Sequence, residues 1–134
     1  MPSRVESLNL VIAGEKDDLS VSVQPGERLR LRFTHSIHGS LVEETFAVRD
    51  DGFALVRLRY SELRTAEYYG HETARRDGDW WTVDDLHRFM PTLALRVSAE
   101  SDMRLRTNAL KIDLATLSDH GGAVRLSMNK ATAA

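Results

Sequence analysis

The sequence predicts an all-β protein in which an antiparallel meander closes into a β-sandwich or barrel. Apolar and polar residues alternate in many short stretches, which is the period-two pattern of half-buried strands. Turn-forming sequences such as QPGE, HGSL, DDG and SDHGG separate these stretches. Short strands with turns about every ten residues are typical of sandwiches and barrels.

The strands are expected in two groups separated by a segment of different character. In the first group the apolar residues alternate over 8–12, 19–23, 29–33, 42–48 and 54–60. In the second group they alternate over 93–97, 103–105, 110–114 and 124–128. We therefore expect one domain over residues 1–134, with an N-terminal meander (8–60), an intervening segment (61–90) and C-terminal strands (91–129).

Composition narrows the class of protein. The chain has 134 residues, of which 42% are hydrophobic and 28% charged, as in one soluble globular domain. A net charge of −2 gives no reason to expect a nucleic-acid partner. The absence of cysteine excludes disulfides, thiolate nucleophiles and cysteine-based metal sites. No apolar run reaches transmembrane length, and the first ten residues lack the apolar region of a signal peptide.

The turns predict strand registers. A three-residue loop at Asp50–Gly52 would place Glu44 opposite Leu58. A loop over His38–Leu41 would place Phe33 opposite Phe46 and His35 opposite Glu44. His35 and Glu44 each occupy a position where the alternation calls for an apolar residue. Directly opposed residues share a sheet face, so the sequence predicts an inward-facing His35–Glu44 pair in hydrogen-bond contact.

Such a pair has three interpretations. It could be a purely structural polar pair, part of a ligand site, or an acid–base unit. The candidate ligand-binding residues are His35, Ser36, Glu44 and Tyr60. Catalysis is disfavoured because Ser36 should leave the opposite face of the strand from His35. A metal site needs three or four ligands, but Glu43 should point away from Glu44 and His38 should lie in a mobile loop, so we expect no metal site and no cofactor.

The segment 61–90 interrupts the alternation next to the predicted pair, because Tyr60 should lie opposite Val42. Long insertions of this kind often serve as lids or binding loops, although Trp80 or Trp81 could simply cover the open end of the core. We expect short helical turns in SELRTAEYYGHE and in TVDDLHRFMP.

Many arginines occupy the outward phase of the strands. Arg30, Arg32 and Arg57 are predicted to form an interaction face for an anion or an acidic partner. The alternative is a solvated face that discourages aggregation of sheet edges, whose arginines could be replaced with little change in stability.

The stretch FTHSIHGSLVEETFAV, with Thr34, His35, Ser36, Glu44 and Phe46, resembles the signature of the domain-of-unknown-function family 1850. Members of that family are commonly encoded beside TRAP-type transporters of the TAXI class and usually carry an export signal or anchor. The segment SELRTAEYYGHETARRDG departs from the small, glycine-rich stretch of those relatives.

The resemblance implies an extracytoplasmic accessory domain of a TRAP-type transport system. Its partner would be a small organic acid or a transporter component bound near His35 and Glu44, and membrane contact would need an anchor absent from this chain. The alternatives are a protein-interaction module that uses the arginine face, or a small acid–base enzyme. Because no export segment is visible, a cytoplasmic location is the alternative to a periplasmic one.

Overall fold

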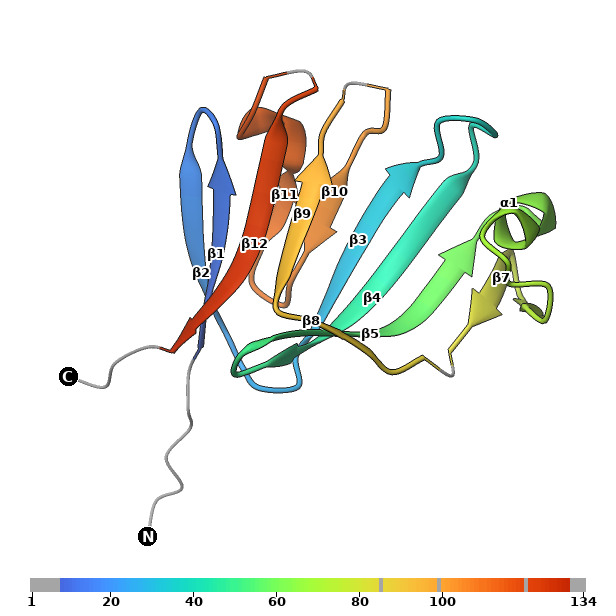
Figure 1. The fold of residues 1–134 in the computed structure, drawn as a ribbon, viewed down its shortest axis with the longest axis horizontal. Helices are drawn as coiled ribbons and strands as arrows, with labels where there is room; N and C mark the ends of the chain where they lie inside the picture. The colour runs from blue at the N-terminus through green and yellow to red at the C-terminus, as the bar shows by residue number, and fades with distance from the viewer. Residues whose placement is uncertain (1–7, 85, 99, 120, 131–134) are drawn as a thin grey trace, which may run out of the picture.

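A computed structural model describes residues 8–84, 86–98, 100–119 and 121–130, which form two antiparallel sheets (Figure 1). The smaller sheet has the strand order β2-β1-β12-β9 and consists of β1 (Leu8–Gly14), β2 (Asp18–Val23), β9 (Thr92–Arg96) and β12 (Ala123–Lys130). The larger sheet has the order β11-β10-β3-β4-β5-β7-β6, and β8 pairs with β5. Its strands are β3 (Arg28–Thr34), β4 (Leu41–Arg49), β5 (Gly52–Tyr60), β6 (Arg75–Asp77), β7 (Trp80–Val83), β8 (Arg88–Met90), β10 (Arg104–Arg106) and β11 (Lys111–Asp113).

The predicted all-β antiparallel fold is confirmed, and the two sheets form a sandwich rather than a closed barrel. The meander has one interruption. After β2 the chain leaves the smaller sheet and begins β3 in the larger sheet, so residues 8–60 serve both sheets. A short 3-10 helix, η1 (Leu114–Thr116), follows β11, with Asp113 accepting a hydrogen bond from the Ala115 backbone N–H.

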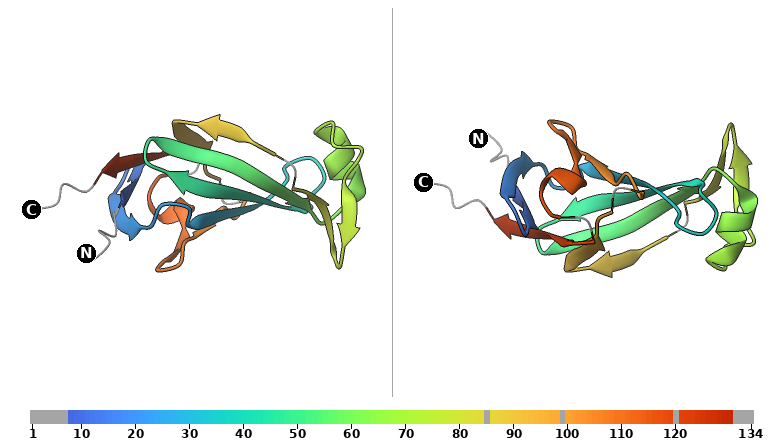
Figure 2. Two further views of the ribbon diagram at one scale, coloured as in Figure 1. Left: turned by 90° about the horizontal axis from the view of Figure 1, so that it is seen from below. Right: turned by 90° about the horizontal axis from the view of Figure 1, so that it is seen from above.

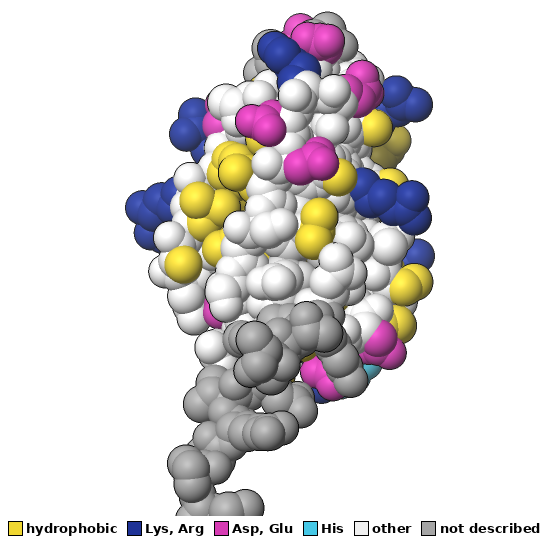
Figure 3. All heavy atoms as spheres, turned by 90° about the vertical axis from the view of Figure 1, so that its left-hand side faces the viewer, with side chains coloured by type: hydrophobic (Ala, Val, Ile, Leu, Met, Phe, Trp, Pro, Cys, Tyr) yellow, Lys and Arg dark blue, Asp and Glu magenta, His cyan; other side chains and the backbone are white. Residues whose placement is uncertain are grey.

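The core lies between the sheets and follows the predicted alternation. Leu10 and Ile12 of the smaller sheet and Leu29 and Leu31 of the larger sheet are fully buried, whereas Arg30 between the latter two is exposed. On the side of the smaller sheet, acidic and basic side chains lie interspersed with hydrophobic ones (Figure 3). No described helix is long and apolar enough to cross a membrane.

The register between β3 and β4 differs from the predicted one by four residues. Leu31 lies opposite Glu44, Leu29 opposite Phe46 and Thr34 opposite Leu41. The connecting loop therefore covers residues 35–40, and the predicted direct pairing of His35 with Glu44 is wrong. A four-residue shift keeps every side chain on its predicted face, so Glu44 still lies on the inner face of the sheet.

The predicted register of the β4–β5 hairpin is right in one half and wrong in the other. Near its open end, Glu44 lies opposite Leu58 and Val42 opposite Tyr60, as predicted. Beyond Thr45 the register shifts by one residue, and β4 and β5 then meet at Arg49 and Gly52. The loop therefore has two residues, Asp50 and Asp51, and a bulge in β5 takes up the third.

Segment 61–90 contains one of the two predicted helical turns. Helix α1 (Leu63–Tyr68) forms within SELRTAEYYGHE. The second predicted helical turn, in TVDDLHRFMP, is wrong: β7 ends at Val83, β8 begins at Arg88, and the described residues between them (84, 86 and 87) are irregular. Both views in Figure 2 place α1, β6 and β7 at the end of the sandwich away from the smaller sheet.

Candidate functional site

His35 lies in the loop directly after β3 and organises it. Its backbone N–H donates to the Ser40 carbonyl over 2.7 Å, and its carbonyl accepts from the Gly39 N–H over 2.9 Å. The ring Nδ1 accepts from the His38 backbone N–H over 3.2 Å. In the neutral ring the proton is therefore on Nε2. Only 5% of His35 is exposed, so its ring is part of the interior of this end of the protein.

Helix α1 covers this loop through Thr65 and two tyrosines. The fully buried Thr65 hydroxyl lies 2.6 Å from the Ser40 hydroxyl and 3.0 Å from His38 Nδ1. The His35 ring centroid lies 5.2 Å from that of Tyr68 and 5.4 Å from that of Tyr69, in edge-to-face geometry. We call the loop 35–40 together with α1 and Tyr69 the His–Tyr end.

Burial lowers the pKa of His35, and the neighbouring His38 lowers it further. Both effects disfavour the imidazolium form. At neutral pH His35 is accordingly a neutral hydrogen-bonding group, in agreement with its role as an acceptor for the His38 N–H.

Glu44 lies on the inner face of β4, between Leu31 and Leu58 of the neighbouring strands. Among the described residues no hydrogen bond or ion pair joins it to His35. Burial raises its pKa to about 7 because the apolar surroundings disfavour the carboxylate. Glu44 in turn contributes to the raised pKa values of Tyr60 and Tyr69, for which burial is the largest cause. The acid is thus close to two phenols, and the Tyr60 ring stacks on that of Tyr69 at 5.7 Å.

The four predicted ligand-binding residues differ in how far they are exposed to solvent. His35 and Tyr60 are buried, with 5% and 1% exposure, and Glu44 is half-buried. Ser36 is exposed in the turn after His35. Among the described residues, no group of three or more His, Asp or Glu side chains has the spacing of a metal site.

Exposed hydrophobic side chains gather at the His–Tyr end. Five large hydrophobic side chains are exposed in the described part of the chain, and four of them belong to this end or adjoin it: Ile37, Leu41, Tyr68 and Tyr69. Leu41 is the first residue of β4, and its backbone N–H donates to the Ser61 hydroxyl beside α1. The fifth, Phe89, is in β8.

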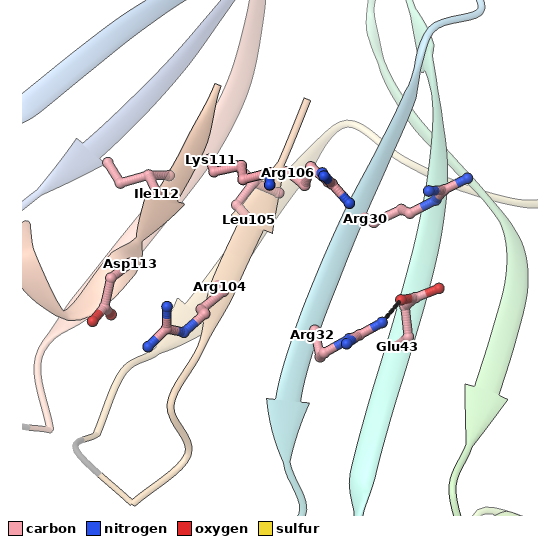
Figure 4. Close-up of a pocket in the computed structure, with 9 residues that line it drawn as sticks. All are labelled: Arg30, Arg32, Glu43, Arg104, Leu105, Arg106, Lys111, Ile112 and Asp113. Atoms are coloured by element: carbon pink, nitrogen blue, oxygen red, sulfur yellow. Dashed lines mark hydrogen bonds and ion pairs between the residues drawn. The ribbon is translucent and has the colours of Figure 1, made fainter. Parts of the chain in front are cut away.

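The outer face of the larger sheet contains a hollow of about 310 Å³ between β3, β10 and β11 (Figure 4). We call it the arginine groove, and it is lined by Arg30, Arg32, Glu43, Arg104, Leu105, Arg106, Lys111, Ile112 and Asp113.

Two rows of side chains cross the groove. In one row, Lys111 lies opposite Arg106, and Arg106 lies opposite Arg30. Two residues along the strands, the second row runs Asp113, Arg104, Arg32 and Glu43. The first row contains three cations and ends on β4 at Thr45, whereas the second contains two cations and two acids.

The three predicted interaction-face arginines have different partners. Arg30 is exposed in the groove. Arg32 donates to Glu43 over 2.8 Å, and its guanidinium lies 5.3 Å from the centre of the Trp80 ring. Arg57 lies on the same face, across Thr45 from Arg30, but it is half-buried. Arg59 of β5 lies opposite Glu43.

Comparison with models of known protein families identifies the family of this chain. Residues 29–114 match the family model described as Domain of unknown function (DUF1850). The chain belongs to the DUF1850 family. Comparisons with curated proteins and with solved structures give no match. The part that matches DUF1850 includes both the His–Tyr end and the strands of the arginine groove.

Sequence reasoning missed two parts of these sites. The sequence predicts the helical turn that ends at Tyr68, but a helix of six residues is too short for periodicity to tell its buried side, Thr65 and Ala66, from the exposed side with Tyr68 and the adjoining Tyr69. The pairing of β10 with β3 joins residues about 75 positions apart, for which no turn gives a signal. The shared alternation of arginine and leucine in the two strands was the available clue.

Proposed function

We propose that this DUF1850 protein is a binding module that docks onto a component of a TRAP-type transport system through its His–Tyr end. The observation that carries the proposal is the gathering of Ile37, Leu41, Tyr68 and Tyr69, exposed by 40–64%, at one end of the molecule. Clustered exposed hydrophobic and aromatic side chains are characteristic of interaction sites.

The packing beneath these side chains supports docking by a preformed surface. Thr65 ties α1 to both His38 and Ser40, so the loop that carries Ile37 and the helix that carries Tyr68 are held together. A rigid surface loses less conformational entropy on association than a mobile one.

The burial of His35 and Tyr60 favours a protein partner over a small ligand at this end. These two side chains offer little surface to any ligand, and their contacts instead hold Tyr68 and Tyr69 in place. The transport context and an extracytoplasmic location rest on the family resemblance. Fractionation of the protein in its native host tests the location separately.

The test measures affinity for purified components of the TRAP-type system from the same organism. Ile37→Ser and Tyr68→Ser should each weaken binding about tenfold or more, the loss expected for a central interface side chain. Phe89→Ser is the matched control, because Phe89 is 47% exposed but lies in β8.

Circular dichroism should show that all three variants are folded. A wild-type protein that binds no transport component would refute the proposal. A loss of affinity in Phe89→Ser equal to that in Ile37→Ser would refute the assigned surface.

A further inference from the structure

The cation row of the arginine groove lacks the counter-charges that its neighbour has. In the second row Arg32 pairs with Glu43, and Arg104 pairs with Asp102 at 3.1 Å. For the side chains of Arg30, Arg106 and Lys111, the described part of the chain provides no hydrogen-bond or ion-pair partner. Glu27, close to this end of β3, already accepts the backbone N–H groups of Gln24 and Asn108.

The strand register holds these cations together. Arg106 lies directly opposite both Arg30 and Lys111, on the face where side chains of opposed residues are neighbours. Like charges in this arrangement destabilise a sheet. An anion bound from solvent would relieve the repulsion among these three cations, since no carboxylate of the row does so.

The surface at this row is hollowed. Arg30 and Arg106 line the arginine groove of about 310 Å³ and also an adjoining hollow of about 250 Å³ with Arg28, Thr107 and Asn108. Figure 4 shows Arg30 and Arg106 at one end of the groove, away from the ion pair of Arg32 with Glu43. The groove volume is in the range of small-molecule sites.

We propose that Arg30 and Arg106, assisted by Lys111, bind a small multivalent oxyanion, either a polycarboxylate or a phosphate ester. Guanidinium groups match the paired oxygens of carboxylate and phosphate with two parallel hydrogen bonds. The site is on the outer sheet face and does not depend on the docking function assigned to the His–Tyr end.

The experiment is isothermal titration of the protein with citrate, succinate and glycerol 3-phosphate at low, matched ionic strength. Wild-type protein should bind at least one of them, and added salt should weaken binding. Arg30→Gln and Arg106→Gln should each weaken it about tenfold or more. Arg104→Gln, in the neutralised row, should have a smaller effect.

Arg125→Gln is the matched control, since Arg125 is an exposed strand arginine of the smaller sheet. A second readout is the melting temperature without ligand, which should stay equal or rise in Arg30→Gln as repulsion is relieved.

Tighter binding of citrate or succinate would identify the ligand as a polycarboxylate, and tighter binding of glycerol 3-phosphate would identify it as a phosphate ester. Failure of all three anions to bind the wild type more tightly than about 10 mM would overturn the proposal, as would equal losses in Arg125→Gln. Binding of a hexaglutamate peptide through Arg30 without binding of any small anion would overturn the small-ligand assignment.

Discussion

Glu43 and Glu44 are consecutive in β4, yet their carboxyl groups lie in opposite surroundings. Glu43 faces the outer side of the larger sheet, where it pairs with Arg32 and lies opposite Arg59. Glu44 faces the inner side, between Leu31 and Leu58, and its pKa is raised to about 7. Glu43 thus has a cation as its partner, whereas Glu44 has apolar neighbours on both adjacent strands, and burial there disfavours its charged form.

The difference shows how one strand serves two kinds of polar region. On the outer face, cross-strand neighbours supply charges, so the sheet holds a buried carboxylate and has cations in excess beside it. At the inner end, the neighbours are apolar or phenolic, and the acid is accommodated as a neutral group at mildly acidic pH. Substitutions of Glu44, Arg32 and Thr65 test this contrast, and the largest effect is expected at Glu44.

Glu44→Gln should stabilise the protein at pH 8 by about 3 kcal/mol, because glutamine resembles the neutral acid that the fold prefers. In the wild type, the unfolded chain releases the Glu44 proton above about pH 4.5, whereas the folded chain retains it until about pH 7. Stability from this group is therefore full below about pH 4.5, falls as pH rises to about 7, and is constant above. Urea denaturation at pH 5 and pH 8 measures the change.

The depressed pKa of His35 works in the opposite direction, so its stabilisation is present above about pH 6.5 and is lost as pH falls. This contribution is common to both proteins and cancels in the difference. A stability difference between wild type and Glu44→Gln that is the same at both pH values would contradict the assignment.

Arg32→Ser should destabilise the protein by about 2 kcal/mol, because it leaves the Glu43 carboxylate buried without its cation. Arg104→Ser should cost less than about 0.5 kcal/mol, since the pair with Asp102 is exposed on both sides. A large loss for Arg32→Ser would contradict the alternative in which the outward-facing arginines are all solvated and can be replaced with little change in stability. Chemical denaturation provides the values.

A double variant sharpens the test. Arg32→Ser combined with Glu43→Ser should cost less than the sum of the two single changes. Additive losses would mean that the ion pair contributes nothing to the difference between the two glutamates.

The alternation predicted which face each residue occupies but did not predict the register. Shifting β4 by four residues along β3 keeps Leu29, Leu31, Glu44 and Phe46 on the inner face, so the hydrophobic pattern permits both registers. The choice is made by the loop, where His35 bonds to Ser40 and to the His38 N–H. Thr65 of α1 contacts Ser40 and His38 of this loop, and although the sequence predicts a helical turn here, it does not predict that the turn packs on the loop.

Long-range strand order escaped prediction for a related reason. Alternating arginine and leucine in 28–32 and 104–106 predicts two outward arginine faces, but nothing in the pattern says that the strands are neighbours. Arg30 was therefore identified from the sequence, whereas its opposition to Arg106 required the fold.

Thr65→Val should give the smallest of the three effects, a loss of about 1 kcal/mol, and it tests what holds the inner end closed. Valine keeps the shape of threonine but removes the hydroxyl that contacts both Ser40 and His38. The Ser40 hydroxyl, on a residue that is 5% exposed, would then lose that partner in the interior. Hydrogen exchange should become faster at the α1 amides and in the loop 35–40 while exchange in β3 and β10 stays unchanged. Uniform acceleration over both sheets would instead mean that Thr65 supports the whole sandwich, and unchanged exchange at α1 would mean that the apolar contacts of Ala66 and Leu63 suffice to hold the helix.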